Sequence, residues 1–129
     1  MFTRDTHFAN YLETQEGSKL PVEHCVFGTE GWQIHPELMP FVNEEPIDKV
    51  TFGSVDLGRR VSEMQDVTGV TLLGLCTDIC VISNAMLIKA FCPELTVRVD
   101  ARGCAGVSPE SHERALDAMA TCQIEILGR

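Results

Sequence analysis

The sequence lacks three features that would place it in other classes of protein. No apolar stretch approaches the ~18 residues that a membrane-spanning helix needs. Lys and Arg number 10 against 19 Asp and Glu and form no cluster, so the net charge of −9 disfavours nucleic acid or an anionic membrane as partner. No secretory signal precedes the six cysteines, which favours reduced thiols over a disulfide framework. We therefore expect a soluble, cytoplasmic protein with a small-molecule ligand.

The residues that are present suit one core and a parallel sheet. The chain has 129 residues and is 44% hydrophobic, which predicts one domain and not two. Residues 1–45 are rich in turns and predict a long functional loop. Strand-like runs at 70–75, 95–99 and 123–127 alternate with helix-like segments. This βαβαβ order predicts parallel strands joined by crossover helices.

Capping residues mark two of the expected helices. Ser54 can cap one helix, and Ser108, followed by Pro109, can cap another. A further helix is expected over 79–91, and a short strand around 49–52. In open α/β sheets, ligands bind beyond the carboxyl ends of the strands, so the pattern predicts one site there.

Cys80 lies where an apolar run ends and an amphipathic run begins, in GLCTDICV at 74–81. The positive end of a helix dipole at this point favours thiolate over thiol, which suits a nucleophile. The alternative is a small buried hydrophobic residue. Lys49 could help to hold a thiolate or an anionic intermediate, or it could be a surface lysine whose stem covers apolar surface.

A second group of polar residues lies in the loop-rich first half. An Asp-x-His pair, Asp5 and His7, can turn both side chains to one face of an extended segment. His24 and Glu16 could complete a metal site, and this mixture of ligands would suit zinc, iron or manganese. The alternative is that these side chains are simply solvated.

These segments together resemble the isochorismatase-like cysteine hydrolases, the superfamily that contains nicotinamidases. Besides GLCTDICV, five segments look like that family and follow its order: TRDTH at 3–7, LPVEHC at 20–25, GTEGW at 28–32, DKVTFGS at 48–54 and AGVSPESH at 105–112. The resemblance implies an α/β protein with a three-layer α/β/α architecture. Its mostly parallel, doubly wound (Rossmann-like) sheet would belong to a single domain, residues 1–129.

The resemblance also implies roles for individual residues. Cys80 would attack an amide carbonyl and form a thioester, with Lys49 as the lysine of the family's triad. The peptide bond between Leu75 and Cys76 would be cis, as is common in the family. The backbone N–H groups of Cys76 and Cys80 would form the oxyanion hole.

The metal-type residues match the nicotinamidase branch. Asp5, His7 and His24 match the metal ligands of nicotinamidases, and Glu16 lies near where some members supply another ligand. The implied cofactor is a divalent metal, zinc first, that orients the substrate's ring nitrogen or a water molecule. Three aromatic residues could line a ring-binding pocket or belong to the core: Tyr11, Trp32 and Phe52.

The sequence departs from the family at the first strand. The family's triad is Asp-Lys-Cys, and its aspartate ends a central strand upstream of the segment that residues 3–7 resemble. We therefore expect the chain to lack this strand and this aspartate, and neither Asp48 nor Asp78 corresponds to it. Two sheet edges would then have no partner, which is an association hazard. Either the chain is a fragment of a hydrolase, or a neighbouring strand or another subunit fills the gap, and we expect a homo-oligomer.

The preferred function is hydrolysis of the C–N bond of a small amide, with nicotinamide to nicotinate and ammonia as the leading case. An isochorismatase-type hydrolysis is an alternative on the same fold that would not need the metal. A truncated, non-catalytic pseudoenzyme that keeps ligand, metal or dimer contacts is an alternative of another class. A thiol redox protein built on Cys76 and Cys80 is a third.

Overall fold

The computed structural model describes residues 1–129, which form two compact units, Met1–Thr51 and Phe52–Arg129. In the first unit, strands β1 (Thr3–Asp5) and β2 (Ile47–Lys49) pair in parallel, with Asp5 opposite Lys49. Four short helices lie between them in sequence: η1 (Tyr11–Glu13), α1 (Gln15–Lys19), η2 (Glu30–Trp32) and η3 (Pro36–Phe41). The turn-rich first half is therefore built from short elements around one pair of strands.

The predicted strand around residues 49–52 is wrong in position. β2 begins at Ile47 and ends at Lys49, so Lys49 closes the strand and does not open it. The pairing register explains the difference, because β1 offers only three residues and the last of them lies opposite Lys49. Beyond that point the chain has no strand to pair with, and Val50 is exposed.

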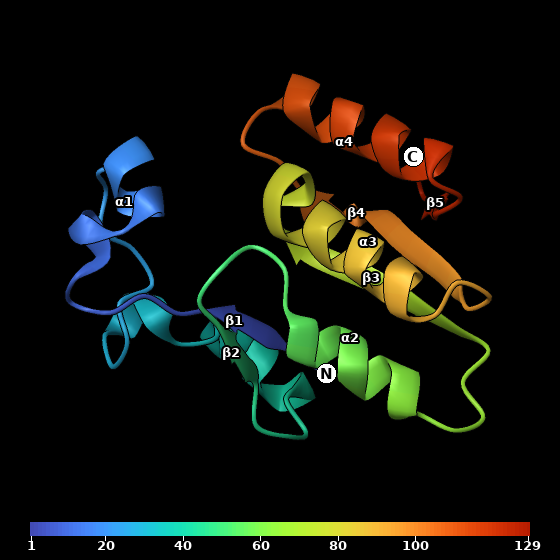
Figure 1. The fold of residues 1–129 in the computed structure, drawn as a ribbon, viewed down its shortest axis with the longest axis horizontal. Helices are drawn as coiled ribbons and strands as arrows, with labels where there is room; N and C mark the ends of the chain where they lie inside the picture. Colours follow the sequence, from blue (N-terminus) through green and yellow to red (C-terminus); the bar gives the residue numbers. More distant parts are fainter. The chain divides into compact units, whose positions relative to one another are not determined.

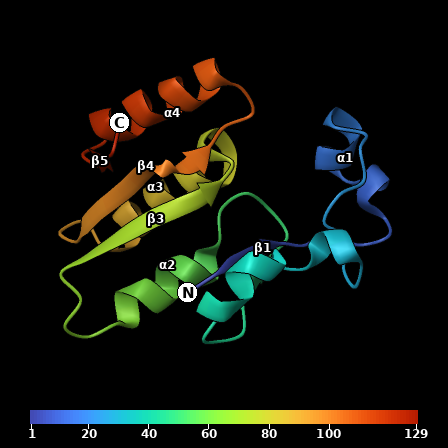
Figure 2. The ribbon, with the colours of Figure 1, turned by 180° about the vertical axis from the view of Figure 1, so that it is seen from behind.

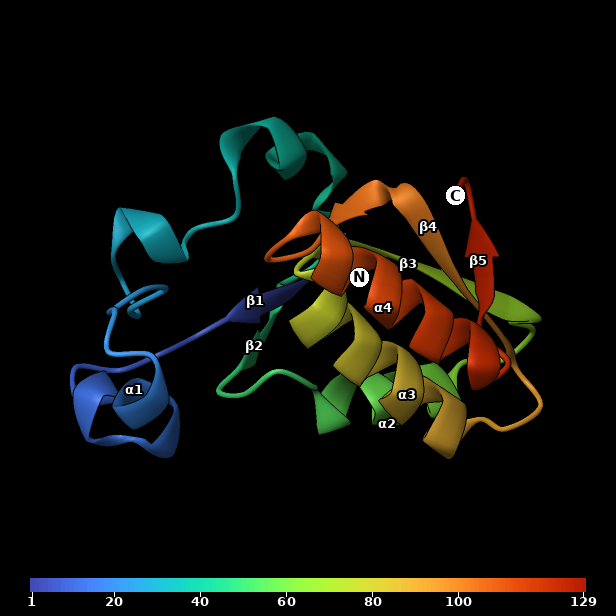
Figure 3. The ribbon, with the colours of Figure 1, turned by 90° about the horizontal axis from the view of Figure 1, so that it is seen from above.

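The second unit is an α/β unit with a three-stranded parallel sheet in the order β3-β4-β5. Its elements are α2 (Val55–Glu63), β3 (Gly69–Leu75), a π turn (Thr77–Val81), α3 (Ile82–Phe91), β4 (Thr96–Ala105), α4 (Pro109–Thr121) and β5 (Glu125–Leu127). Helices α2, α3 and α4 lie on one side of the sheet (Figures 1 and 3). The opposite face of β3 and β4 is turned to the viewer in Figure 2, with no helix of this unit over it. The predicted α/β class with a parallel sheet is confirmed.

The core of the second unit lies between the sheet and its helices. Val97 and Val99 of β4 and Leu116 and Met119 of α4 are fully buried. Their alternation along β4 follows the period of two that directs every second side chain to one face of a sheet. Burying a side chain of this size contributes roughly 1.5–3 kcal/mol, so these four residues contribute substantially to the stability of this unit.

The helix starts agree with the capping residues in the sequence. Ser54 Oγ accepts from the N–H of Leu57 at 3.1 Å, and Ser108 Oγ accepts from the N–H of Ser111 at 3.2 Å. The helix expected over 79–91 begins as the π turn and becomes α-helical at Ile82. No helix is both long and apolar enough to cross a membrane.

Four strands each keep one edge without a strand partner. In the first unit β1 and β2 pair only with each other, and in the second unit β3 and β5 each pair only with β4. This agrees with the expected lack of one central strand. Strand β4 is longer than predicted and reaches Ala105, with a register shift against β3 between Leu72 and Gly74.

Candidate active site

Four side chains of the first unit bring their donor atoms together. Asp5 ends β1, His7 follows it, Glu16 comes from α1, and His24 comes from the loop after α1. One donor atom of each lies within 4.8 Å of the others. His7 Nε2 is 3.4 Å from Asp5 Oδ2 and 3.6 Å from Glu16 Oε1, and His24 Nε2 is 3.8 Å from each of these oxygens. The structure therefore brings together all four residues that the sequence singled out as metal-type ligands.

His24 is arranged as a metal-ligating histidine usually is, and His7 offers an unsatisfied nitrogen. His24 Nδ1 lies 2.7 Å from the carbonyl oxygen of Val22. Because a carbonyl only accepts, Nδ1 carries the proton and Nε2 presents a lone pair to the cluster. His7 Nε2 is buried and has no hydrogen-bond partner. Leaving such an atom unsatisfied costs about 1–3 kcal/mol, which a cation bound between these donors would relieve. The donor set therefore fits a divalent cation.

Tyr11 forms a wall of this cluster. Its side chain is 0% exposed, and its ring centroid lies 4.5 Å from that of His7 and 5.2 Å from that of His24. The hydroxyl donates to the carbonyl oxygen of Leu20 at 2.9 Å. Burial raises the pKa of the Tyr11 hydroxyl, and the two nearby carboxylates raise it further. The phenol thus keeps its proton, and its ring holds both imidazoles in place.

Lys49 is connected to the cluster through Asp5. Its side chain is buried, and Nζ donates to Asp5 Oδ1 and to the carbonyl oxygen of Thr51, both at 3.2 Å. The other oxygen of Asp5 faces the histidines. Asp5 therefore contacts Lys49 with one oxygen and the two histidines with the other. Because Lys49 is buried, it is not the surface lysine that was the alternative.

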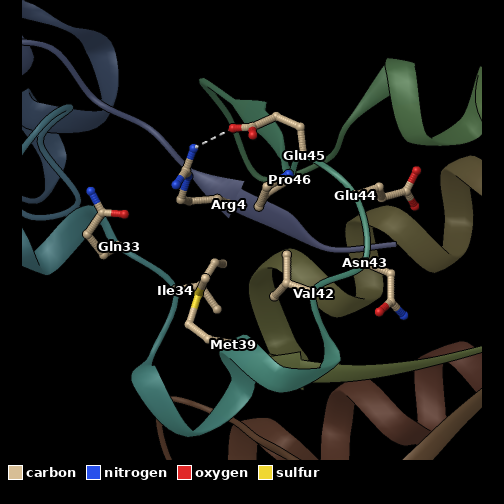
Figure 4. A pocket seen from close by; sticks show the side chains of 9 residues that line it. All are labelled: Arg4, Gln33, Ile34, Met39, Val42, Asn43, Glu44, Glu45 and Pro46. Atoms are coloured by element: carbon tan, nitrogen blue, oxygen red, sulfur yellow. Dashed lines mark ion pairs between the residues drawn. The ribbon is translucent and has the colours of Figure 1, made fainter.

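Trp32 stabilises β1 from one side. The guanidinium of Arg4 lies 3.5 Å from the centroid of the Trp32 ring, and Trp32 Nε1 donates to Thr6 Oγ1 at 3.0 Å. Arg4 Nε also donates to Asp48 Oδ1 at 2.7 Å. A cavity of about 440 Å³ opens beside Arg4, which pairs there with Glu45 (Figure 4). Trp32 and Asp48 are thus both engaged in contacts around Arg4.

Cys80 lies in the π turn of the second unit, directly before α3. The Leu75–Cys76 peptide bond that precedes the turn is cis, which confirms the expectation from the resemblance. The carbonyl oxygen of Cys76 accepts from the N–H groups of Ile79 and Val81 at 3.1 and 3.0 Å, so it closes the turn.

The surroundings of Cys76, the other cysteine of the motif, favour its thiol form. Burial raises the pKa of the Cys76 thiol, and the neighbouring Asp78 and Cys80 raise it further. Cys76 is therefore held as a thiol, which disfavours a redox pair with Cys80. All six cysteines are thiols in the structure.

Asn84 is a residue that the sequence analysis missed. It is buried in α3, and its Nδ2 donates to the carbonyl oxygens of Cys80 at 2.8 Å and Phe52 at 3.2 Å. Its Oδ1 accepts from the N–H of Ser54 at 2.8 Å. One amide therefore ties the backbone of Cys80 to residues 52–54. The only signal in the sequence was the spacing of four residues from Cys80, which puts both on one face of a helix.

A family model described as the isochorismatase domain matches residues 1–128. The chain belongs to the isochorismatase family. No curated protein matches its sequence.

Several solved structures share the isochorismatase fold of this chain. The pyrazinamidase/nicotinamidase from Streptococcus mutans UA159 has a TM-score of 0.81 at 27% identity, over 98% of this chain and 74% of its own. The pyrazinamidase of Pyrococcus horikoshii, in complex with zinc, has a TM-score of 0.78 at 25% identity, over 97% and 72%. The nicotinamidase from Bacillus subtilis has a TM-score of 0.75 at 24% identity, over 98% and 72%. The chain thus belongs to the isochorismatase-like hydrolase family and has its fold.

Proposed function

We propose that this isochorismatase-family chain hydrolyses the C–N bond of a small amide, with nicotinamide to nicotinate and ammonia as the leading case. The cluster of Asp5, His7, Glu16 and His24 carries the proposal. An isochorismatase-type hydrolysis of an ether would not need a metal, so a four-residue donor set that includes the buried, unsatisfied Nε2 of His7 favours the amide. The similar fold of a nicotinamidase and a pyrazinamidase/nicotinamidase, at 24% and 27% identity, also supports an amide as the substrate.

The cofactor in this proposal is a divalent metal held by the four donors. Zinc, iron and manganese all accept imidazole together with carboxylate, and the Pyrococcus horikoshii pyrazinamidase with zinc supports zinc first. When bound, the metal would supply a Lewis acid that orients a ring nitrogen or a water molecule. Tyr11 and the carbonyl of Val22 keep the histidine rings oriented for it.

Cys80 is the nucleophile in this proposal. Its sulfur forms a bond to the amide carbonyl carbon while the carbonyl π electrons move to oxygen. The oxyanion is stabilised by the backbone N–H groups of Cys76 and Cys80. The thiol proton is transferred to the amide nitrogen, the oxyanion re-forms the carbonyl, and the C–N bond breaks to release ammonia. Water next attacks the thioester, the C–S bond breaks, and the products are the carboxylic acid and the restored thiol.

Lys49 and the aromatic residues also have roles in the proposed reaction. The side chain of Lys49 is buried, and the resemblance implies that its positive charge would stabilise the thiolate or the anionic intermediate. Of the three aromatic residues proposed for the substrate ring, Phe52 is the one with a substantially exposed side chain, at 41%. Tyr11 and Trp32 are already packed against His7 and Arg4.

The test is ammonia release from nicotinamide and pyrazinamide by the purified chain, with isochorismate as a competing substrate class. We expect release from an amide, loss of release in Cys80→Ala, and loss after chelation that added zinc restores. Cys92→Ala, at the end of α3, is the matched control and retains activity. Turnover of isochorismate with no ammonia from any amide would contradict the proposal, and so would full activity in Cys80→Ala. No turnover of either class would favour the non-catalytic alternative.

A further inference from the structure

A residue near the start of α4 forms a hydrogen bond with the π turn that carries Cys80. Thr77, the first residue of the turn, is 0% exposed. Its Oγ1 lies 2.7 Å from Nδ1 of His112, a residue 35 positions later in α4. A hydrogen bond this short between a buried hydroxyl and an imidazole fixes both side chains. The turn is therefore tied to α4 by a side-chain pair to which neither the resemblance nor the proposed chemistry assigns a role.

A second contact ties the same two segments. The carboxylate oxygens of Asp78 accept from the N–H of Val107 at 3.2 and 3.3 Å. Partial burial raises the pKa of Asp78, but hydrogen bonds from Ser111 and Val107 lower it by more, so the pKa is lowered overall. Two successive residues of the turn, Thr77 and Asp78, thus contact the same short segment of the chain.

The segment before α4 is built to keep His112 close. A Cβ placed on Gly106 would lie 2.9–3.0 Å from the Cβ, Cα and N atoms of His112, so only glycine allows this approach. The N–H of His112 donates to the carbonyl oxygen of Ser108 at 2.9 Å. A hollow of about 280 Å³ lies beside His112, lined by the residues that precede it: Cys104, Ala105, Gly106, Val107, Ser108 and Pro109. His112 is therefore rigidly placed between this hollow and the π turn.

We propose that His112 is a positioning residue that acts through Thr77 to hold the π turn, and with it the sulfur of Cys80 and the N–H groups of Cys76 and Cys80, in the reactive arrangement. This role rests on the proposed function. Thr77 lies between Cys76 and Cys80, so a shift of its backbone displaces the nucleophile and the oxyanion donors together. A misplacement of about 1 Å at a reacting centre can cost on the order of 10²-fold in rate.

The experiment uses the full chain loaded with zinc and two readouts. The first is kcat and KM for nicotinamide hydrolysis. The second is the rate at which iodoacetamide alkylates Cys80, followed on the Cys80 peptide by mass spectrometry. The variants are Thr77→Val, which keeps the shape and removes the hydroxyl, His112→Ala, and the double variant. Thr77→Ser and His112→Asn each keep a polar atom near the lost one.

We expect Thr77→Val and His112→Ala each to lower kcat by roughly ten- to a hundredfold with KM within about twofold. The double variant falls no further than the worse single variant, because both remove the same contact. Thr77→Ser and His112→Asn recover most of the rate. Alkylation of Cys80 changes by a common factor in the two single variants and the double variant. Two controls on the same helix, Thr121→Val and Arg114→Ala, leave both readouts unchanged because both residues are exposed.

Three results would overturn this role for His112. These are additive losses in the double variant, a change in KM alone, and unchanged values of both readouts in Thr77→Val. The two proposals fail separately. If the wild-type chain releases no ammonia from any amide, the proposed function fails, and the alkylation rates of Cys80 alone decide for or against His112.

Discussion

The substitution His7→Phe separates the stability of the first unit from its ability to bind a metal. The phenyl ring keeps the packing of His7 against Tyr11 and His24, whose ring centroids lie 4.5 and 4.7 Å away. It removes Nε2, which is buried without a hydrogen-bond partner. Removing an unsatisfied buried polar atom recovers about 1–3 kcal/mol, and the larger ring offsets part of this gain. We therefore expect the metal-free variant to be more stable than the metal-free wild type by about 1 kcal/mol.

The same substitution removes one of four donors from the metal site. Four-ligand zinc sites bind with roughly 10–16 kcal/mol, so one ligand accounts for about 3 kcal/mol, or on the order of 10²-fold in affinity. At zinc concentrations of about 100 times Kd, the wild type gains about 2.7 kcal/mol of stability, which corresponds to roughly 10 °C in Tm. The variant loses most of this gain at the same zinc concentration.

The assay is thermal unfolding with a chelator and with added zinc, together with calorimetric titration of zinc. We expect His7→Phe to raise Tm in the chelator and to lose most of the rise with zinc. His35→Phe is the matched control, because His35 is exposed and lies outside the cluster, and it keeps the zinc response. A variant that is less stable without metal and still binds zinc with wild-type affinity would refute the reasoning for His7.

Two further substitutions test the second unit. Asn84→Ala leaves the N–H of Ser54 and the carbonyls of Cys80 and Phe52 without their side-chain partner. We therefore expect the free energy of unfolding in denaturant to fall by about 2–3 kcal/mol and kcat to fall as well. Asn10→Ala, at an exposed position, is the control and has no effect. Equal stability of Asn84→Ala and wild type would show that these hydrogen bonds do not matter. Because the pKa of Asp78 is lowered in the folded state, its ionised form stabilises the fold above its unfolded pKa, and this stability is lost as pH falls through the folded pKa. The free energy of unfolding of Asp78→Asn should therefore be about 1 kcal/mol below that of the wild type at pH 7, and this difference should shrink below about pH 4. A difference that does not depend on pH would contradict this.

Local signals were the part of the fold that the sequence predicted well. Ser54 and Ser108 cap their helices as expected, because a cap depends only on residues within one turn. The strand expected at 49–52 was misplaced, because β2 takes its bounds from its pairing with Thr3–Asp5, more than forty residues away. Pairing between distant segments leaves no local pattern in either strand.

The sequence predicted those site residues that belong to recognisable sequence motifs. Asp5, His7, Glu16 and His24 do meet, and Cys80 does lie directly before α3. The partners that hold the π turn were missed, since the contact of Thr77 with His112 spans 35 residues and depends on how α4 packs on the sheet. The roles of these residues, the single domain, the homo-oligomer and the cytoplasmic location stay predictions.

The most direct measurement of the central claim is the mass of the Cys80 peptide after rapid acid quenching of a nicotinamide reaction. Acid stabilises a thioester, so the covalent intermediate can be isolated and digested. The account predicts a nicotinoyl group on Cys80 in the wild type and none in Cys80→Ala, which also releases no ammonia. Ammonia release by Cys80→Ala at the wild-type rate, with no acyl group on Cys80 of the wild type, would contradict it.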